Sequence, residues 1–201
     1  MGGDITPKSH ERTSRKGGNL IVKINRNQYL DYVLFDSEHK IRHGGFMKRV
    51  LFVCLGNICR SPTAEAVFKD RVESAGLEDS IKIDSAGTIA AHAGHPADSR
   101  MSTHASARGY ELTSISRKVT LDDFTFFTHI YAMDKQNLSD LKAMAPNDST
   151  VELELFLSLD SSASSVEVPD PYYGGAHGFE TVLDLIESAS DCLLAHLREE
   201  T

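Results

Sequence analysis

The 201-residue sequence lacks the features that mark secreted and membrane-spanning proteins. Its three cysteines are too few for a disulfide framework. No stretch approaches the roughly 18 consecutive apolar residues that a membrane helix needs, and the N-terminal segment MGGDITPKSHERTSRKGG contains no apolar core of a secretory signal. We therefore expect a globular protein of the reducing cytoplasm, with no membrane partner.

A surplus of positive charge is also missing from most of the chain. Residues 1–46 hold eight Lys/Arg and five Asp/Glu, a net charge of +3; because the whole chain carries −8, residues 47–201 carry −11. So acidic a segment has few cations to neutralise backbone phosphates, which excludes nucleic acid as a partner. Any anionic ligand must be held by local donors against this field.

Hydrophobic patterning divides the chain into two parts. The segment 19–35 alternates loosely between apolar and polar residues, as a small hairpin does, and a His-Gly-Gly triplet at 43–45 then interrupts the pattern. We interpret residues 1–46 as an N-terminal extension, either disordered or the product of a start assigned too early. Residues 47–201 are expected to form the functional domain, as a monomer or a weak dimer.

From residue 47 onward, strand and helix signals alternate. Short apolar runs predict four strands, at 50–54, 81–87, 129–134 and 151–157. Helical spacing and end signals predict helices at 62–75, 97–108, 135–144 and about 177–198, with a short helix opening at 120–123. Repeated strand–helix units indicate an α/β three-layer sandwich: a four-stranded parallel sheet with helices on both faces.

The segment VLFVCLGNICRSP suggests the chemistry. Its apolar strand ends at Cys54, and ligands of parallel sheets bind beyond the carboxyl ends of strands. The helix that follows offers free N–H groups and its positive dipole end, Gly56 permits a tight path, and Arg60 adds a planar fork of donors. This surrounding favours a thiolate, which is a nucleophile for phosphorus. We therefore predict a phosphate-binding loop after the first strand, made of Leu55, Gly56, Asn57, Ile58, Cys59 and Arg60, with Ser61 donating to the Cys54 thiolate.

Displacement at phosphorus also needs an acid for the leaving oxygen, and Asp170 is the best candidate. It lies in VPDPYYGG between two prolines that stiffen the loop. Tyr172 and Tyr173 follow and are suited to wall a pocket for an aromatic ring. The alternative, a Pro/Gly turn with two exposed tyrosines, stays open on this segment alone.

Taken together, the segments VLFVCLGNICRSPTAEAVF, IDSAGT, VT-x-x-DF, AMD-x-x-NL and DPYYGG, in that order, resemble the low-molecular-weight protein tyrosine phosphatases over about residues 48–198. The resemblance implies hydrolysis of phosphotyrosine proteins or small aryl phosphates through a cysteinyl-phosphate intermediate, with no metal or cofactor. It makes Cys54 the nucleophile, Arg60 the clamp on phosphoryl oxygens and Asp170 the acid and then the base. The supporting roles it implies are loop ordering by Asn57, Ser61 and Ser85 and an entrance lined by Tyr172 and Tyr173.

The sequence also departs from the family pattern. Ala91 stands where many members carry an aromatic residue at the entrance, and Arg108 where some carry a histidine that faces the loop. Asp134 is expected to cap a helix or to brace the loop. His92 and His95 have no third ligand nearby, so we interpret them as loop surface rather than as a metal site.

Three alternative functions are compatible with a loop of this kind. Protein arginine phosphatases share the loop but usually carry Thr where this chain has Ile58, and they lack the double tyrosine. Thiol-dependent arsenate reductases need further cysteines, and beyond the loop the sequence has only Cys192, in the last predicted helix. A non-catalytic phosphate-binding module is the third. Cys59 either packs the loop or forms a reversible disulfide with Cys54, which would make the enzyme redox-sensitive.

Overall fold

The computed structural model describes residues 12–16, 19–26, 29–35, 41–42, 47–173 and 175–199. The chain forms two compact units, Met1–Met47 and Lys48–Thr201, which are treated separately. In the first, strands β1 (Arg12–Lys16), β2 (Asn19–Arg26), β3 (Tyr29–Phe35) and β4 (Ile41–Arg42) form an antiparallel sheet in that order.

Strands β2 and β3 pair with Arg26 opposite Tyr29, which is the arrangement of the hairpin expected over 19–35. The interpretation of residues 1–46 as a disordered extension or an early start stays a prediction, as does the boundary after residue 46.

The second unit is built on a four-stranded parallel sheet, as the sequence predicts. Its strands are β5 (Lys48–Cys54), β6 (Ile81–Gly87), β7 (His129–Ala132) and β8 (Glu152–Leu155), in the spatial order β6-β5-β7-β8. The first strand in sequence is therefore central, and Val50 to Val53 have no exposed surface. Burial on both faces explains the unbroken apolar run of this strand.

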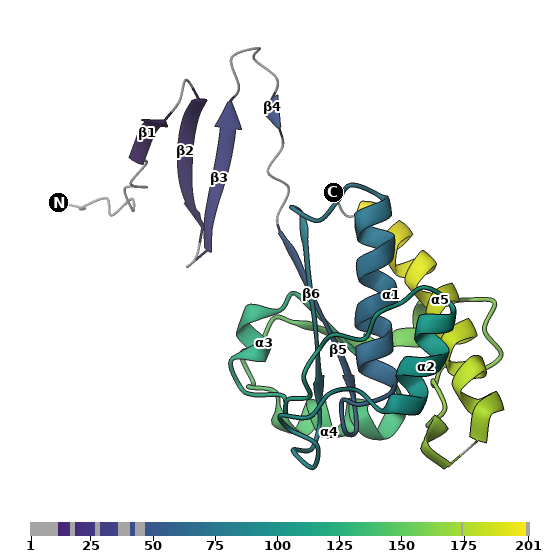
Figure 1. The fold of residues 1–201 in the computed structure, drawn as a ribbon. Helices are drawn as coiled ribbons and strands as arrows, with labels where there is room; N and C mark the ends of the chain where they lie inside the picture. The colour runs from purple at the N-terminus through teal and green to yellow at the C-terminus, as the bar shows by residue number, and fades with distance from the viewer. Residues whose placement is uncertain are drawn as a thin grey trace. The chain divides into compact units, whose positions relative to one another are not determined.

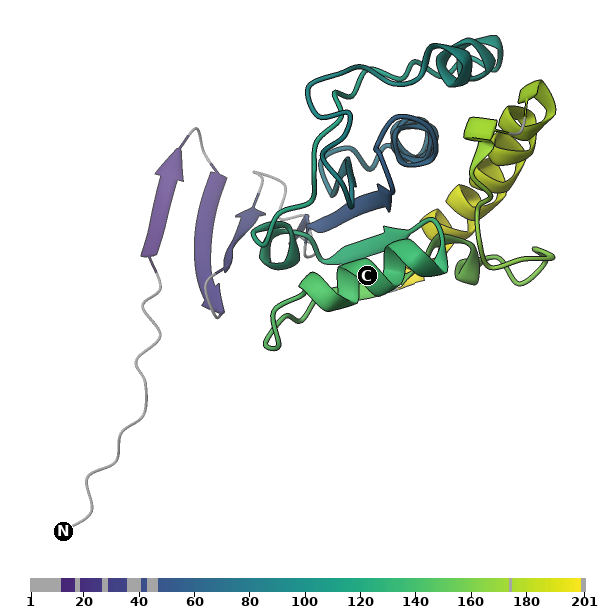
Figure 2. The same cartoon turned by 90° about the horizontal axis from the view of Figure 1, so that it is seen from below.

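Helices cover both faces of this sheet, which completes the expected three layers (Figures 1 and 2). Val50 and Phe52 of β5 belong to a core shared with helices α1 (Arg60–Ser74), α2 (Ser99–Ala107) and α5 (Gly175–Glu199). Leu51 and Val53 point the other way, into a core with α3 (Asp123–Phe126) and α4 (Lys135–Met144). The alternation follows from the two-residue period of a strand.

Several element boundaries differ by a few residues from the sequence prediction. Helix α1 begins at Arg60 rather than 62, so Ser61 lies in its first turn with its hydroxyl directed at Cys54 and the Ala86 carbonyl. Strand β7 ends at Ala132 rather than 134. Strand β8 ends at Leu155, and the chain continues as a 3-10 turn, η1 (Phe156–Leu159), that buries Phe156 and Leu157. A second 3-10 turn, η2 (Pro171–Tyr173), precedes α5. Over the described residues, no helix has the length and apolar character needed to cross a membrane.

Candidate active site

The loop from Cys54 to Arg60 joins the carboxyl end of the central strand to the start of α1, which runs back alongside β5 (Figure 1). Two backbone hydrogen bonds hold the loop against the end of β6: Thr88 N–H donates to the Cys54 carbonyl (2.9 Å) and Ile89 N–H to the Leu55 carbonyl (3.1 Å). A Cβ on Gly87 would lie 2.8 Å from the Leu55 carbonyl oxygen, so only glycine allows this approach.

Cys54 lies at the base of the loop with 3% of its surface exposed. Its Sγ is 3.1 Å from the Ser61 hydroxyl oxygen and accepts the Asn57 backbone N–H at 3.2 Å. The Asn57 N–H donates to the sulfur, and the Ser61 hydroxyl can do so when its proton turns from the Ala86 carbonyl; hydrogen bonds to an ionised group are about twice as strong as those between neutral groups.

Asn57 organises the loop from within. It is the one residue other than glycine with positive φ (54°) among the described residues, a conformation that asparagine tolerates better than most side chains. Its Nδ2 donates to the hydroxyls of Ser61 and Ser85, each at 2.9 Å, and its Oδ1 accepts the Arg117 backbone N–H at 2.9 Å. The buried Ser85 hydroxyl in turn donates to Glu65 on α1. The structure thus brings together the three residues predicted to order the loop.

Helix α1 presents its N-terminus to the same space. Its N-cap residue, Cys59, makes no side-chain capping hydrogen bond within the described part of the chain, and its first turn holds no acidic residue. The N–H groups of that first turn and the positive end of the helix dipole therefore favour an anion in front of Cys54.

Arg60 is 3% exposed and is oriented by two carboxylates. Its Nη1 donates to Asp134 Oδ2 (2.6 Å) and to the Val168 carbonyl (3.1 Å), while Nη2 donates to Asp170 Oδ2 (3.1 Å). Burial on its own would lower the pKa of Arg60, but Cys54 and the two carboxylates outweigh it and raise the pKa above the ordinary value. The guanidinium is therefore a permanent positive charge at the mouth of the loop.

Asp134 has both of the roles considered from the sequence. Its Oδ1 accepts the Asn137 backbone N–H (2.7 Å) and so caps α4, while its Oδ2 pairs with Arg60.

Asp170 reaches the site from a loop on the surface. Its side chain is 44% exposed, and besides Arg60 it accepts the Tyr172 backbone N–H at 3.1 Å. The loop is anchored on one side by buried Val168, whose N–H donates to the Met133 carbonyl. Arg100 anchors the other side by donating to the Tyr172 carbonyl (3.3 Å) and lying over the Tyr172 ring at 5.1 Å.

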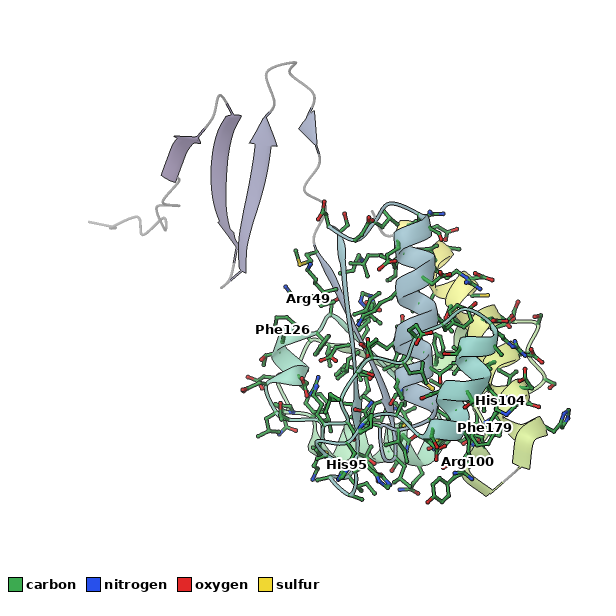
Figure 3. The ribbon with its side chains drawn as sticks, in the orientation of Figure 1. Arg49, His95, Arg100, His104, Phe126 and Phe179 are labelled. Atoms are coloured by element: carbon green, nitrogen blue, oxygen red, sulfur yellow. The ribbon has the colours of Figure 1, made fainter. Side chains whose placement is uncertain are left out.

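Arg100 also ties this loop to the rest of the domain. Figure 3 shows it beside Phe179, and its guanidinium carbon is 5.3 Å from that ring centroid. Its Nη2 donates to Asp98 Oδ2 at 2.8 Å, and the Asp98 backbone N–H donates to the Ile58 carbonyl in the phosphate-binding loop at 2.8 Å. No local sequence pattern indicates this link, because it joins side chains from α2, α5 and two loops.

These residues surround a cavity of about 240 Å³. Its lining comprises Cys54, Leu55, Gly56, Ile58, Cys59, Arg60, Ile89, His92, Asp170 and Tyr172. Ala91 is exposed and does not belong to the lining, although its neighbours Ile89 and His92 do. The side chain of Tyr173 lies outside the described part of the chain.

Two positions singled out from the sequence prove to have other surroundings. His92 belongs to the cavity wall rather than to bare loop surface, whereas His95 is exposed. Arg108 turns away from the phosphate-binding loop: it pairs with Glu180, Asp184 and Glu187 on α5. Among the described residues, no three His, Cys, Asp or Glu side chains gather as metal ligands.

Cys59, the second thiol of the cavity, is chemically unlike Cys54. It is free and 5% exposed. Burial, followed by the nearby charges of Asp98 and Cys54, raises its pKa from 9.0 to about 12. Near neutral pH this thiol stays protonated, so the two sulfurs are not interchangeable as nucleophiles.

Comparison with known proteins agrees with this geometry. Residues 49–201 match the family "Low molecular weight phosphotyrosine protein phosphatase". A low molecular weight protein-tyrosine-phosphatase of Streptomyces coelicolor is 43% identical over 155 residues, which is 76% of this chain and 94% of that protein.

Solved structures lead to the same family. A protein tyrosine phosphatase from Entamoeba histolytica has a TM-score of 0.74 and 43% identity, with 76% of this chain and 97% of that chain covered. A Drosophila arginine phosphatase has a TM-score of 0.71 and 33% identity, with 74% and 97% covered. The chain belongs to the low-molecular-weight phosphotyrosine protein phosphatase family and is a phosphoric monoester hydrolase.

Proposed function

We propose that Cys54 is the nucleophile of this phosphatase. The observation that carries the proposal is its sulfur at the base of the loop, between the Ser61 hydroxyl and the Asn57 N–H and in front of the N-terminus of α1. The thiolate attacks phosphorus, the bond from phosphorus to the phenolic oxygen breaks, and a cysteinyl phosphate forms. The helix N–H groups and Arg60 stabilise the negative charge on the three phosphoryl oxygens during this step.

Arg60 exchanges partners when substrate binds. Phosphoryl oxygens compete with Asp170 for Nη2, and a bidentate pair with phosphate is stronger than one hydrogen bond of 3.1 Å to a half-exposed carboxylate. Asp134 holds Nη1 throughout, at 2.6 Å, and keeps the fork in place. The exchange frees Asp170 beside the leaving oxygen.

Asp170 then acts in both halves of the reaction. Protonated, it gives its proton to the leaving phenolate in the first step. As a carboxylate it next takes a proton from the water that attacks phosphorus, the sulfur–phosphorus bond breaks, and phosphate leaves while Cys54 returns to thiolate. Its exposed position suits this task, because the acid must face the leaving group and then the incoming water.

Phosphotyrosine fits the shape and polarity of the cavity. The phosphoryl group lies at the loop, and the apolar side chains of Ile58, Ile89 and Tyr172 are placed along the wall for an aromatic ring. Phosphoarginine is the second candidate, favoured by the likeness to a Drosophila arginine phosphatase. A guanidinium would gain little from these apolar walls, so we expect the tyrosine ester to be the better substrate.

A direct comparison of substrates tests the proposal. Phosphotyrosine, phosphoserine and phosphoarginine peptides of otherwise identical sequence are assayed side by side in EDTA, with phosphate release as the readout. We expect kcat/KM to be greatest for phosphotyrosine. A greater value for phosphoarginine would overturn the substrate assignment while leaving the Cys54 mechanism intact, and binding of all three without turnover would favour a phosphate-binding module.

Cys54 and Cys59 support a second, regulatory proposal. Peroxide oxidises the Cys54 thiolate to a sulfenic acid; the Cys59 thiol then displaces water from that sulfur and a disulfide forms, which two reducing equivalents from a dithiol reverse. Because the pKa of Cys59 is raised to about 12, Cys54 is the sulfur that is oxidised first. In Cys59→Ser excess peroxide oxidises the sulfenic acid further to a sulfinic acid, which dithiothreitol does not reduce. Excess peroxide followed by dithiothreitol should therefore restore the activity of the wild type and leave Cys59→Ser inactive. Equal recovery of both proteins would contradict the disulfide.

The proposal also covers the cellular compartment and the oligomeric state of the enzyme. We infer a reducing, cytoplasmic compartment and a monomer or weak dimer. Sedimentation at several protein concentrations measures the second point: a single species of twice the chain mass at nanomolar concentration would contradict it.

A further inference from the structure

A second cavity lies against the catalytic one. Its volume is about 500 Å³, and Leu55, Arg60 and Asp170 belong to the lining of both. The rest of its lining comes from the start of α4 and from the segment before Asp170: Asp134, Gln136, Asn137, Ser165, Glu167, Val168 and Pro169. The mechanism uses the shared wall together with Asp134 and Val168, which hold Arg60, whereas the other lining residues have no role in the hydrolysis itself.

The lining of the second cavity is negatively charged. Three carboxylates, those of Asp134, Glu167 and Asp170, face one guanidinium, that of Arg60. Lys135 Nζ also lies 3.4 Å from Glu167 Oε2, but these side chains are 68% and 37% exposed, and such a surface pair is weak. The Lys135 backbone N–H also donates to Glu167 Oε1 at 2.8 Å, but an N–H carries no net charge, so the excess of negative charge in the lining favours a cation over a second anion.

Asn137 supplies an independent sign that a ligand belongs there. It is 1% exposed, it lines the cavity, and its Oδ1 has no hydrogen-bond partner among the described residues. A buried acceptor without a donor is costly, and native structures rarely leave one. The N–H of Asn137 is already used by Asp134 at the start of α4, so the helix fixes where the side chain projects.

We propose that this cavity binds the ammonium or guanidinium group of a Lys or Arg near the phosphotyrosine of a substrate protein. The cation would lie in the field of Glu167 and Asp134, and a small rotation of the buried Asn137 side chain would bring its Oδ1 to the cavity surface to accept a hydrogen bond from it. Because the two cavities share a wall, a side chain a few residues from the phosphotyrosine reaches the second cavity while the phosphoryl group occupies the first. The inference rests on the proposed function and names the class of protein substrate within it.

Peptide substrates test this directly. A phosphotyrosine peptide is made with norleucine, Lys, Arg or Glu at each of the three positions before and after the phosphotyrosine. Each kcat/KM is divided by that of the same enzyme on p-nitrophenyl phosphate, so a general loss of activity cancels. At one or two positions we expect Lys and Arg to exceed norleucine by about tenfold, the value of one charge-assisted hydrogen bond. Glu at those positions should fall below norleucine.

Variants connect the preference to the cavity. Glu167→Gln removes one negative charge and Asn137→Ala removes the acceptor; each should reduce the ratio of Lys to norleucine by about threefold to tenfold. Glu199→Gln is the matched control, because it removes the same charge at the far end of α5, 24 residues and about 36 Å along the helix from Gly175. Its ratio should equal that of the wild type.

Three results would overturn the inference. One is equal hydrolysis of all peptides by the wild type. Another is a preference for Lys that persists in both variants, which places the selectivity elsewhere. The third is hydrolysis of p-nitrophenyl phosphate with no peptide turned over, which contradicts the proposed function itself and this inference with it.

Discussion

The two loops that meet at the catalytic cavity are held in very different ways. The phosphate-binding loop is part of the domain core: Cys54, Asn57 and Arg60 are each 3% exposed or less. The loop that carries the proposed acid, residues 168–173, is called the acid loop. It lies at the surface, with the Asp170 side chain 44% exposed and Tyr172 40% exposed. The first loop is fixed by the same contacts that fix the fold, whereas the second is held by Val168, Arg60 and Arg100. Nucleophile and anion site are therefore rigid, while acid catalysis depends on a few contacts between side chains.

The largest effect is expected at the nucleophile. Cys54→Ser should reduce kcat by about 10⁴-fold to 10⁶-fold, because a hydroxyl in this position lacks the ionised form that attacks phosphorus. Steady-state hydrolysis of p-nitrophenyl phosphate measures it. Cys59→Ser is the matched control, since it changes the other thiol of the same loop. It should keep activity within about tenfold of the wild type, and an equal loss in both would contradict the assignment of Cys54.

The acid loop should give a smaller loss that depends on the leaving group. Asp170→Asn keeps the shape of the side chain but removes the proton to be transferred, so kcat should fall by about 10²-fold to 10⁴-fold. The readout across aryl phosphates whose phenols differ in acidity is kcat/KM, which reports the first step alone, because the second step no longer contains the leaving group. The loss should be greatest for phenyl phosphate, whose leaving oxygen most needs a proton. A loss that is uniform across the series would show that Asp170 is not the acid.

Arg100 sharpens the comparison, because it touches the acid loop and none of the reacting atoms. Arg100→Ala removes its hydrogen bond to the Tyr172 carbonyl and its contact with the Tyr172 ring, so Asp170 loses part of its positioning. We expect kcat/KM to fall by about threefold to tenfold for phenyl phosphate and little for p-nitrophenyl phosphate.

Two further variants complete that test. The double variant Asp170→Asn, Arg100→Ala should have the same kcat/KM for phenyl phosphate as Asp170→Asn alone. The exposed Arg198, near the end of α5, gives the control Arg198→Ala. An equal loss of kcat/KM for both esters would show that Arg100 contributes to stability and not to the position of Asp170.

The smallest effect concerns Cys59 and pH. Its pKa is raised from 9.0 to about 12, chiefly by burial, so between these values the folded protein keeps a proton that the unfolded chain has lost. Its contribution is fully present below pH 9, and the free energy of unfolding falls as pH rises from there. Urea unfolding at pH 8, 9 and 10 should show a smaller fall in Cys59→Ala than in the wild type. If the free energy of unfolding fell equally with pH in both proteins, the raised pKa of Cys59 would be contradicted.

The sequence predicts the core loop better than the acid loop, for a physical reason. The strand, the turn and the helix around Cys54 and Arg60 are contiguous, so their chemistry can be inferred from one short segment. Asp170 is 110 residues from Arg60, and its segment alone fits an ordinary turn equally well. The residues made it a candidate, and the resemblance to a family then implied its role as the acid and the base.

Some features depend on tertiary contacts that no local pattern records. Arg100 acts through Tyr172, 72 residues away, and Asn137 is notable only because its buried oxygen has no partner. The start of α1 at Arg60 rather than 62 was misjudged for the same reason, because its N-cap residue is Cys59, which is not a typical capping residue. Functional contacts here take precedence over local helix signals.

The central claim, covalent transfer to Cys54, can be tested by trapping the intermediate. Wild-type enzyme is mixed with a phosphotyrosine peptide, quenched in acid within milliseconds, digested and analysed by mass spectrometry. We predict one phosphoryl group on the peptide that contains Cys54, in an amount that decays as free phosphate appears. A phosphoryl group on any other residue, or none at any time during turnover, would contradict the account.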